Sequence, residues 1–383
     1  MKKMIYVCLL TMINFTLFAQ NLKEKGDSYA AKSEYASAAL MYSQCMKTDK
    51  NCLFKMIDLI TEEKIEPIFS DDMFSLVKPL AEANNPASQN YLGWIYKKGN
   101  GVQKNYDEAI KWFRKAADQE YAIGQYNLGL MYGNGYGVKK DDSEAAKWYK
   151  KAADQGNLGA QYNLGLMYNY GQGVQQDYVE GSNWLLKAAE KGYAKAQGDL
   201  GLAYIYGRGV KKDYNVAIKW LRKAAEQNNS GAQTSLGWMY EKGYGVSVDY
   251  TEALKWYKIA ADQDNANAQY NLGYMYSYRD GVQQDYDEAL MWFQKSAEKG
   301  NANGQFGLGL LHRDGKGVTK DYDEAIKWFR KAAEQNNVNA QTGLGWMYEK
   351  GYGVSKNNTE AKKWYKKAAD QGDEFAIKKL NEL

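Results

Sequence analysis

The amino-acid sequence predicts an all-α protein, an α/α solenoid of antiparallel helix pairs that repeat every 36 residues. A tryptophan recurs at this interval without a slip, at Trp112, Trp148, Trp184, Trp220, Trp256, Trp292, Trp328 and Trp364. A Leu-Gly pair recurs in the same way, at residues 92–93, 128–129, 164–165, 200–201, 236–237, 272–273, 308–309 and 344–345. A fixed period of this length indicates stacked supersecondary units rather than one globular core.

The first half of each unit has the pattern of one helix. In the unit around Leu272, the residues Ala268, Leu272 and Tyr276 lie four apart, so they share one helix face. A glycine follows the leucine in every unit, although glycine inside a helix costs about 1 kcal/mol relative to alanine. This repeated cost predicts that the partner helix approaches closely at the glycine.

The second half of each unit begins with a turn and a capped helix. We expect the last glycine of the turn to adopt positive φ, at Gly101, Gly137, Gly173, Gly209, Gly245, Gly281, Gly317 and Gly353. An Asp or Asn with a Glu three residues later has the spacing of a capping box, at Asn105, Asp141, Asp177, Asp249, Asp285, Asp321 and Asn357. Asp213 lacks the Glu. The tryptophan that follows is predicted to be the buried anchor of the unit.

This pattern resembles the Sel1-like repeat, a relative of the tetratricopeptide repeat. The resemblance covers residues 86–383, with eight repeats over 86–372 and a C-terminal capping half-repeat over 373–383. It implies antiparallel helix pairs stacked into a right-handed superhelix that binds partners on its surfaces.

The N-terminal residues predict export. Lys2 and Lys3 precede an apolar run that ends at Phe18 and is followed by Ala19, as in a secretory signal peptide over 1–19. We therefore expect cleavage near Ala19 and a periplasmic or secreted protein without a membrane span. Residues 20–85 are a degenerate, tetratricopeptide-like version of the repeat, expected to cap the stack. Pro86 suits the first turn of the first full unit.

Composition argues against several functions. The chain has 50 Lys and Arg against 46 Asp and Glu, without a basic block, which argues against nucleic acid as a partner. His312 is the single histidine and replaces a packing tyrosine, so neither a metal site nor a cofactor is predicted. Cys45 and Cys52 survive signal cleavage and could either form a disulfide or remain free thiols.

Catalysis is not predicted, although some secreted, cysteine-rich Sel1-like proteins have been described as β-lactamases or penicillin binders. Two S-x-x-K matches occur, Ser75 with Lys78 and Ser296 with Lys299. Neither S-D-N nor K-T-G follows, and both matches fall at ordinary repeat positions. The predicted function is an exported scaffold for a protein or peptide partner. The alternative is a binder or hydrolase of cell-wall glycan, cell-wall peptide or a β-lactam.

The predicted partner site lies on the concave face, formed by the first helices. Its positions are not required by the repeat, yet aromatic residues fill many of them and alternate with charges such as Glu241, Lys242, Glu349 and Lys350. Such a face suits a peptide or a glycan. The candidate contact residues are Trp94, Tyr126, Tyr162, Tyr170, Tyr206, Trp238, Tyr270, Tyr274, Tyr278, Phe306 and Trp346. Trp238 and Trp346 share the same neighbours, which predicts two equivalent pockets.

Overall fold

The computed structural model describes residue 55 and residues 71–278 and 282–383. The predicted signal peptide, most of the predicted N-terminal cap region, and Cys45 and Cys52 lie outside these residues. The chain forms two compact units, Met1–Lys191 and Gly192–Leu383, here called unit 1 and unit 2.

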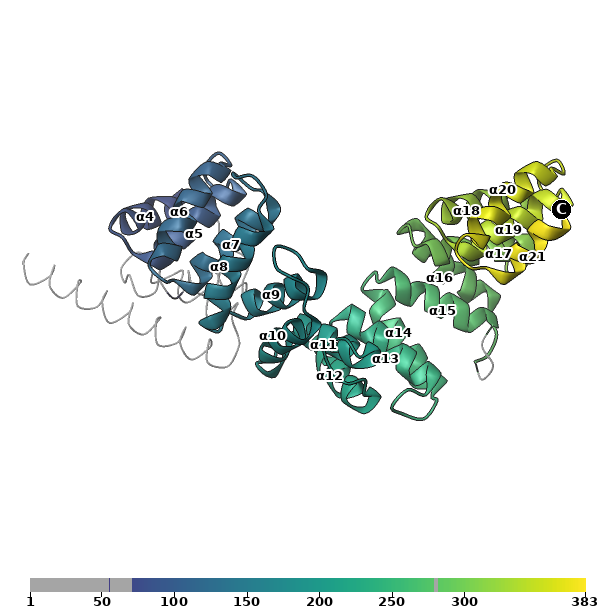
Figure 1. Ribbon diagram of the computed structural model, residues 1–383, viewed down its shortest axis with the longest axis horizontal. Coiled ribbons are helices and arrows are strands. Elements are labelled where there is room, and N and C mark those ends of the chain that lie inside the picture. Colours follow the sequence, from purple (N-terminus) through teal and green to yellow (C-terminus); the bar gives the residue numbers. More distant parts are fainter. Residues whose placement is uncertain (1–54, 56–70, 279–281) are drawn as a thin grey trace, which may run out of the picture. The chain divides into compact units, whose positions relative to one another are not determined.

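The described part of unit 1 consists of successive helices (Figure 1). They are α4 (Asp71–Glu82), α5 (Pro86–Lys98), α6 (Tyr106–Asp118), α7 (Ala122–Asn134), α8 (Asp142–Asp154), α9 (Leu158–Tyr170) and α10 (Tyr178–Glu190). Pro86 occupies the first turn of α5, as predicted.

In unit 2, the first helix of each repeat alternates along the chain with the second helix of that repeat (Figure 1). Its first helices are α11 (Ala194–Tyr206), α13 (Ser230–Lys242), α15 (Ala266–Tyr278), α17 (Ala302–Asp314), α19 (Val338–Lys350) and α21 (Glu374–Glu382). Its second helices are α12 (Tyr214–Glu226), α14 (Tyr250–Asp262), α16 (Tyr286–Glu298), α18 (Tyr322–Glu334) and α20 (Asn358–Ala369).

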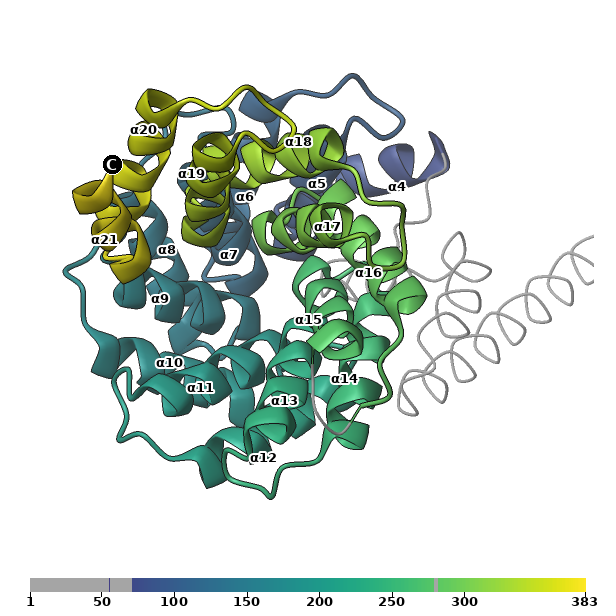
Figure 2. The same ribbon diagram turned by 90° about the vertical axis from the view of Figure 1, so that its right-hand side faces the viewer.

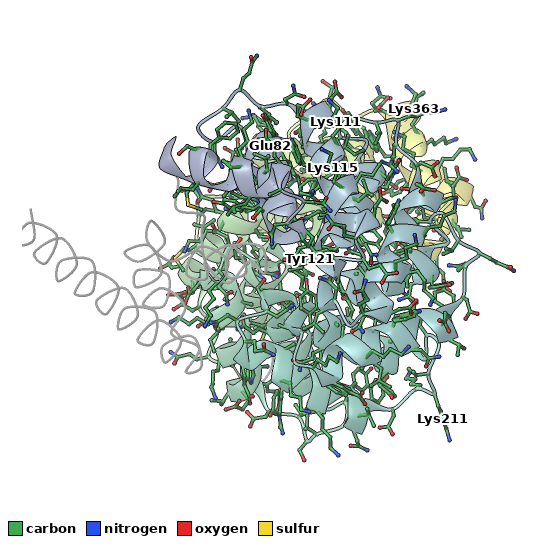
Figure 3. The ribbon with its side chains drawn as sticks, turned by 90° about the vertical axis from the view of Figure 1, so that its left-hand side faces the viewer. Glu82, Lys111, Lys115, Tyr121, Lys211 and Lys363 are labelled. Atoms are coloured by element: carbon green, nitrogen blue, oxygen red, sulfur yellow. The ribbon has the colours of Figure 1, made fainter. Side chains whose placement is uncertain are left out.

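Each first helix packs against the second helix of its own repeat and against the helices next to it in sequence. Within unit 2, Figure 2 shows α13, α15, α17 and α19 on the inner side and α12, α14, α16 and α18 on the outer side. Charged side chains cover the second helices, as Lys111 and Lys115 do on α6 (Figure 3). The described residues contain no strand, and the predicted all-α solenoid of helix pairs is confirmed.

The glycine of the Leu-Gly pair lets the second helix approach closely, as predicted. A Cβ atom at Gly237 would lie 2.7 Å from ring carbon Cδ1 of Tyr257, and one at Gly273 would lie 2.6 Å from Cδ1 of Phe293. The same contact recurs in the other repeats between the pairs Gly93–Phe113, Gly129–Tyr149, Gly165–Leu185, Gly201–Leu221, Gly309–Phe329 and Gly345–Tyr365. The side chain that fills the space is thus the one directly after the tryptophan.

The tryptophan itself is the buried anchor in only part of the repeats. Trp112, Trp148, Trp184 and Trp292 are buried, whereas Trp220, Trp256, Trp328 and Trp364 are half-buried, so the prediction is wrong for this second group. In these four repeats the side chain directly after the tryptophan is fully buried and fills the space against the first helix in place of the indole, at Leu221, Tyr257, Phe329 and Tyr365. A lysine lies over the indole in both groups, 4.1 Å from the ring centre for Lys331 on Trp328 and for Lys115 on Trp112.

The caps form as predicted, with one difference. Asp249 accepts the backbone N–H of Glu252 at 3.0 Å and so caps α14. The Glu252 carboxylate binds Lys255 at 3.0 Å and does not complete a capping box, because the Asp249 N–H already donates to the Tyr240 carbonyl. Before this cap, Gly245 has φ of +71°, and a Cβ there would lie 2.7 Å from the Tyr214 carbonyl oxygen.

A glutamine ladder, which the sequence analysis did not predict, connects neighbouring helices. Gln233 Nε2 donates to the Ala225 carbonyl at 3.0 Å, and its Oε1 accepts from Gln263 Nε2 at 2.7 Å. The side-chain bond recurs between the pairs Gln89–Gln119, Gln125–Gln155, Gln197–Gln227, Gln305–Gln335 and Gln341–Gln371. These bonds satisfy polar groups that are buried between helices.

The ladder is interrupted where lysine replaces the donor glutamine, at Lys191 and Lys299. The acceptors that face these positions are Gln161 Oε1 and Gln269 Oε1, which are both buried without a hydrogen-bond partner. An unpaired buried acceptor costs stability, so these two sites are the weak rungs of the ladder.

We expect Lys299→Gln to raise the free energy of unfolding by about 1 kcal/mol, because it supplies the missing donor to Gln269. The lost ion pair, Lys299 Nζ to Asp264 at 3.0 Å, is solvent-exposed and contributes little. Urea unfolding checks the gain, and Lys295→Gln, an exposed change on the same helix, is the control. Equal or lower stability of Lys299→Gln would contradict this account of the ladder.

Candidate partner-binding surface

The structure divides the predicted contact residues into an exposed and a half-buried group. The exposed group consists of Tyr170 (64%) in unit 1 and Tyr206 (59%), Tyr274 (36%) and Tyr278 (39%) in unit 2. The half-buried group is Trp94, Tyr126 and Tyr162 in unit 1 and Trp238, Tyr270, Phe306 and Trp346 in unit 2. Most of the half-buried group packs against the core of neighbouring helices, as Phe306 does against Phe329 at 5.5 Å between ring centres.

Trp238 and Trp346 occupy equivalent positions in their repeats, and each is the packed end of an aromatic column. The Trp238 ring lies 4.9 Å from Tyr244, which stacks at 4.7 Å on Tyr214. Lys212 Nζ ends the column, 4.8 Å from the Tyr214 ring centre. The second column contains Trp346, Tyr352, Tyr322 and Lys320 with nearly the same spacings. These contacts fix the orientation of both indoles.

The charged residues beside these tryptophans serve internal bonds. Glu349 is buried and accepts from Tyr365 Oη at 2.8 Å and from Lys350 Nζ at 2.7 Å. Burial alone would raise the pKa of this carboxyl, but the bonds from Lys350 and Tyr365 and the charge of Lys379 outweigh it, so the pKa is lowered. Glu241 has the same arrangement with Tyr257 and Lys242, both at 2.8 Å. Neither carboxylate is presented to a ligand.

Three aromatic residues, of which two are exposed, form one continuous face on α15 in unit 2. Tyr270, Tyr274 and Tyr278 lie four residues apart, with ring centres separated by 6.2 Å and 5.6 Å. We call these three residues the α15 tyrosine face. Lys316, just after α17, places Nζ 5.5 Å from the Tyr278 ring centre. The face thus ends at a lysine.

Polar groups near the end of this face can act as hydrogen-bond donors. Burial, followed by the negative charge of Asp314, raises the pKa of the Tyr278 hydroxyl to about 12, so this group stays protonated at neutral pH. Arg313 forms two hydrogen bonds to Asp314, at 2.6 Å and 3.0 Å, and its guanidinium lies 5.7 Å from the Trp346 ring centre. The α15 tyrosine face therefore combines apolar rings with donors.

Comparison with protein families identifies the repeat. A model described as the Sel1 repeat matches eight consecutive segments, residues 86–121, 122–157, 159–193, 194–229, 230–265, 266–301, 302–337 and 338–373. The chain belongs to the Sel1 repeat family. A comparison with curated proteins gives no match.

Two solved Sel1 repeat structures are similar to this chain over most of its length. The protective antigen c5321 of uropathogenic Escherichia coli strains is 31% identical, and the match covers 95% of this chain and 87% of that protein, with a TM-score of 0.55. A Sel1 repeat protein from Oxalobacter formigenes is 35% identical over 82% of this chain and 91% of its own, with a TM-score of 0.61. Both agree with the helix-pair architecture.

Sequence reasoning missed Lys316, which the Sel1 register could have revealed. The residue after the first turn glycine is Tyr136, Tyr244 or Tyr352 in three repeats, and each of these rings stacks on a tyrosine of the preceding repeat. Lys316 holds this position after α17, and its Nζ lies 5.2 Å from the ring centre of the corresponding Tyr286. A lysine where other Sel1 repeats of this chain have a packing tyrosine was the available signal.

Of the residues considered for catalysis, Ser296 and Lys299 lie in a Sel1 repeat, whereas Ser75 and Lys78 lie on α4, before the first repeat. Ser296 is buried, and its hydroxyl donates to the Ala266 carbonyl at 2.7 Å, while Lys299 binds Asp264. Ser75 is exposed on α4. The described residues hold no group of His, Cys, Asp and Glu side chains arranged for a metal ion. None of the described helices combines the length and the apolar character that a membrane crossing requires.

Proposed function

We propose that this Sel1 repeat scaffold is an exported protein that binds an extended segment of a partner protein on the first helices of unit 2. The observation that carries the proposal is the α15 tyrosine face, where three tyrosines line up on one side of a helix and two of them are exposed. Tyrosine combines apolar area with a polar tip, and it is enriched among the residues that dominate binding energy.

The half-buried residues have a supporting role in this proposal. Trp238 and Trp346 each contact the cores of two neighbouring repeats. We therefore assign them to holding the helices of the surface in place, and not to direct contact with the partner. The exposed Tyr206 extends the candidate surface on α11, and Tyr170 is the exposed counterpart in unit 1. The proposal includes no catalytic residue, and the buried, bonded hydroxyl of Ser296 supports this choice.

Export is part of the proposal and rests on the basic start, short apolar run and Ala19 of the sequence. Mass spectrometry of the protein from its native host should find a chain that begins close to Gln20. A mature chain that retains Met1 would contradict export by this route.

The binding surface is tested by site-specific crosslinking followed by measured affinity. A photo-crosslinking amino acid at position 274 should capture the partner in host extract, and the purified partner is then titrated against variants. We expect Tyr274→Ala with Tyr278→Ala to weaken binding by about 2 kcal/mol or more, roughly 30-fold. The matched control is Tyr178→Ala, which removes a similarly exposed tyrosine from a second helix.

Three results decide the proposal. Loss of affinity in the α15 double variant, with unchanged helicity, supports it. Undiminished affinity shows that the partner binds elsewhere. Preferential capture of a glycan instead of a protein favours the alternative, a binder of cell-wall material.

A further inference from the structure

Among the described residues, Lys316 has no acidic partner, unlike three other cations of the first helices in unit 2. Arg313 is bound to Asp314, Lys350 to Glu349, and Lys242 to Glu241. In the part of the chain that the structure describes, no carboxylate lies within ion-pair distance of Lys316. Its Nζ is held between two rings, 5.5 Å from that of Tyr278 and 5.2 Å from that of Tyr286.

The position of Lys316 suits recognition of an anion. Two aromatic faces restrain the ammonium group without consuming its hydrogen bonds, and an ammonium group has three donors. The protonated hydroxyl of Tyr278 adds a donor from the neighbouring ring. A carboxylate that approaches Lys316 therefore meets a restrained cation and a neutral donor, and it would give the lysine an ion-pair partner, which no described residue provides.

The spacing of the tyrosines suits an extended peptide. Alternate side chains of an extended strand point to the same side and are about 6.6–6.8 Å apart. The ring centres along the α15 tyrosine face are 5.6 Å apart from Tyr278 to Tyr274 and 6.2 Å apart from Tyr274 to Tyr270. Side chains at three alternate positions of a peptide can thus face the three rings in turn.

We propose that the α15 tyrosine face and Lys316 bind an extended acidic–apolar peptide, whose Asp or Glu side chain contacts Lys316 and Tyr278. Apolar or aromatic side chains two and four residues away then contact Tyr274 and Tyr270. This inference rests on the proposed function and adds the chemical class of the bound segment. A neutral glycan would leave Lys316 without a counter-charge, so the peptide is favoured. An acidic polysaccharide offers the same carboxylate and is distinguished by experiment.

The test uses the mature full-length chain and short fluorescent peptides. In the probe peptide, an aspartate, a phenylalanine and a leucine alternate with serine, and a matched peptide has asparagine in place of aspartate. We expect the aspartate peptide to bind about tenfold more tightly than the asparagine peptide, since a hydrogen bond to a charged group contributes more than a neutral one. Raising the salt concentration should reduce this difference.

Variants assign the difference to Lys316. We expect Lys316→Gln to abolish the preference for aspartate, whereas Lys295→Gln, which removes an exposed lysine stacked on Trp292, keeps it. Tyr274→Ala should weaken both peptides equally. Thermal unfolding of each variant, followed by circular dichroism, checks that the helices remain formed.

The outcomes separate this inference from the proposed function. Equal binding of the two peptides, no binding of either, or a preference that survives Lys316→Gln overturns the inference. Tighter binding of an oligogalacturonate than of the aspartate peptide also overturns it and assigns the surface to an acidic polysaccharide. The proposed function is tested separately, by the loss of natural partner binding in the Tyr274→Ala and Tyr278→Ala double variant, so failure of the inference does not contradict it.

Discussion

Replacing Tyr257 by alanine will lower the free energy of unfolding by about 3–5 kcal/mol, the range for removal of a buried aromatic side chain. Tyr257 is 0% exposed, and its ring closes on the backbone of α13, where a Cβ at Gly237 would lie only 2.7 Å away. Its hydroxyl also donates to the buried carboxylate of Glu241 at 2.8 Å. The substitution thus leaves both a cavity and a less well solvated charge.

The neighbouring residue provides the matched comparison. Trp256 is larger than Tyr257 but only half-buried, so we expect Trp256→Ala to be less destabilising. Tyr257→Phe separates the hydrogen bond from the packing and should cost about 1.5–3 kcal/mol, since the bond is to a charged group. Urea unfolding gives the energies. A larger loss for Trp256→Ala than for Tyr257→Ala would refute the assignment of the core residue.

Hydrogen exchange shows where this loss is felt. In a stack of repeats, each repeat contacts mainly its neighbours, so Tyr257→Ala should increase exchange in α13 and α14 and in the adjacent helices. Uniform loss of protection throughout the described part of the chain would indicate a single cooperative core instead.

Gly307→Ala and Gly343→Ala will have effects of opposite sign, although the two glycines are equivalent in the repeat. A Cβ at Gly307 would lie 2.5 Å from the ring of Phe293, which is also enclosed by Gly273 on the preceding first helix. Because this ring is fully buried between two helices, it has little room to move. We expect Gly307→Ala to lower the free energy of unfolding by about 1–3 kcal/mol, as overpacked cores do.

Gly343 serves as the control because its Cβ would lie 3.5 Å from Phe329, an ordinary contact distance. Here the higher helix propensity of alanine, about 1 kcal/mol over glycine, should raise stability. Chemical denaturation of both variants provides the comparison. The packing explanation fails if Gly307→Ala is as stable as Gly343→Ala.

Local sequence determined the helices, their caps and the helix pairing of this protein. The spacing of Ala268, Leu272 and Tyr276 defined a helix face, and Asp249 marked the start of the next helix, because both depend on residues within one or two turns. The glycine of the Leu-Gly pair predicted close packing, which the structure confirms. The Sel1 register followed from the same period and is confirmed by the family match.

Tertiary structure decided which side chains fill the core and which remain on the surface. Tyr257 and Trp256 are adjacent aromatic residues, and only the placement of α13 against α14 shows that Tyr257 occupies the space above Gly237. The bond between Gln233 on α13 and Gln263 at the end of α14 joins two different helices, so no pattern within one helix indicates it. The half-buried position of Trp238 likewise follows from contact with Tyr244.

The candidate surface shows the same division. The sequence indicated that Tyr270, Tyr274 and Tyr278 share one helix face, because a spacing of four residues is a local property. Only the packing of α15 against α17 brings Lys316 to Tyr278 and leaves that lysine without an acidic partner in the described part of the chain. Helix period is set by neighbouring residues, whereas burial and charge pairing depend on which helix lies opposite.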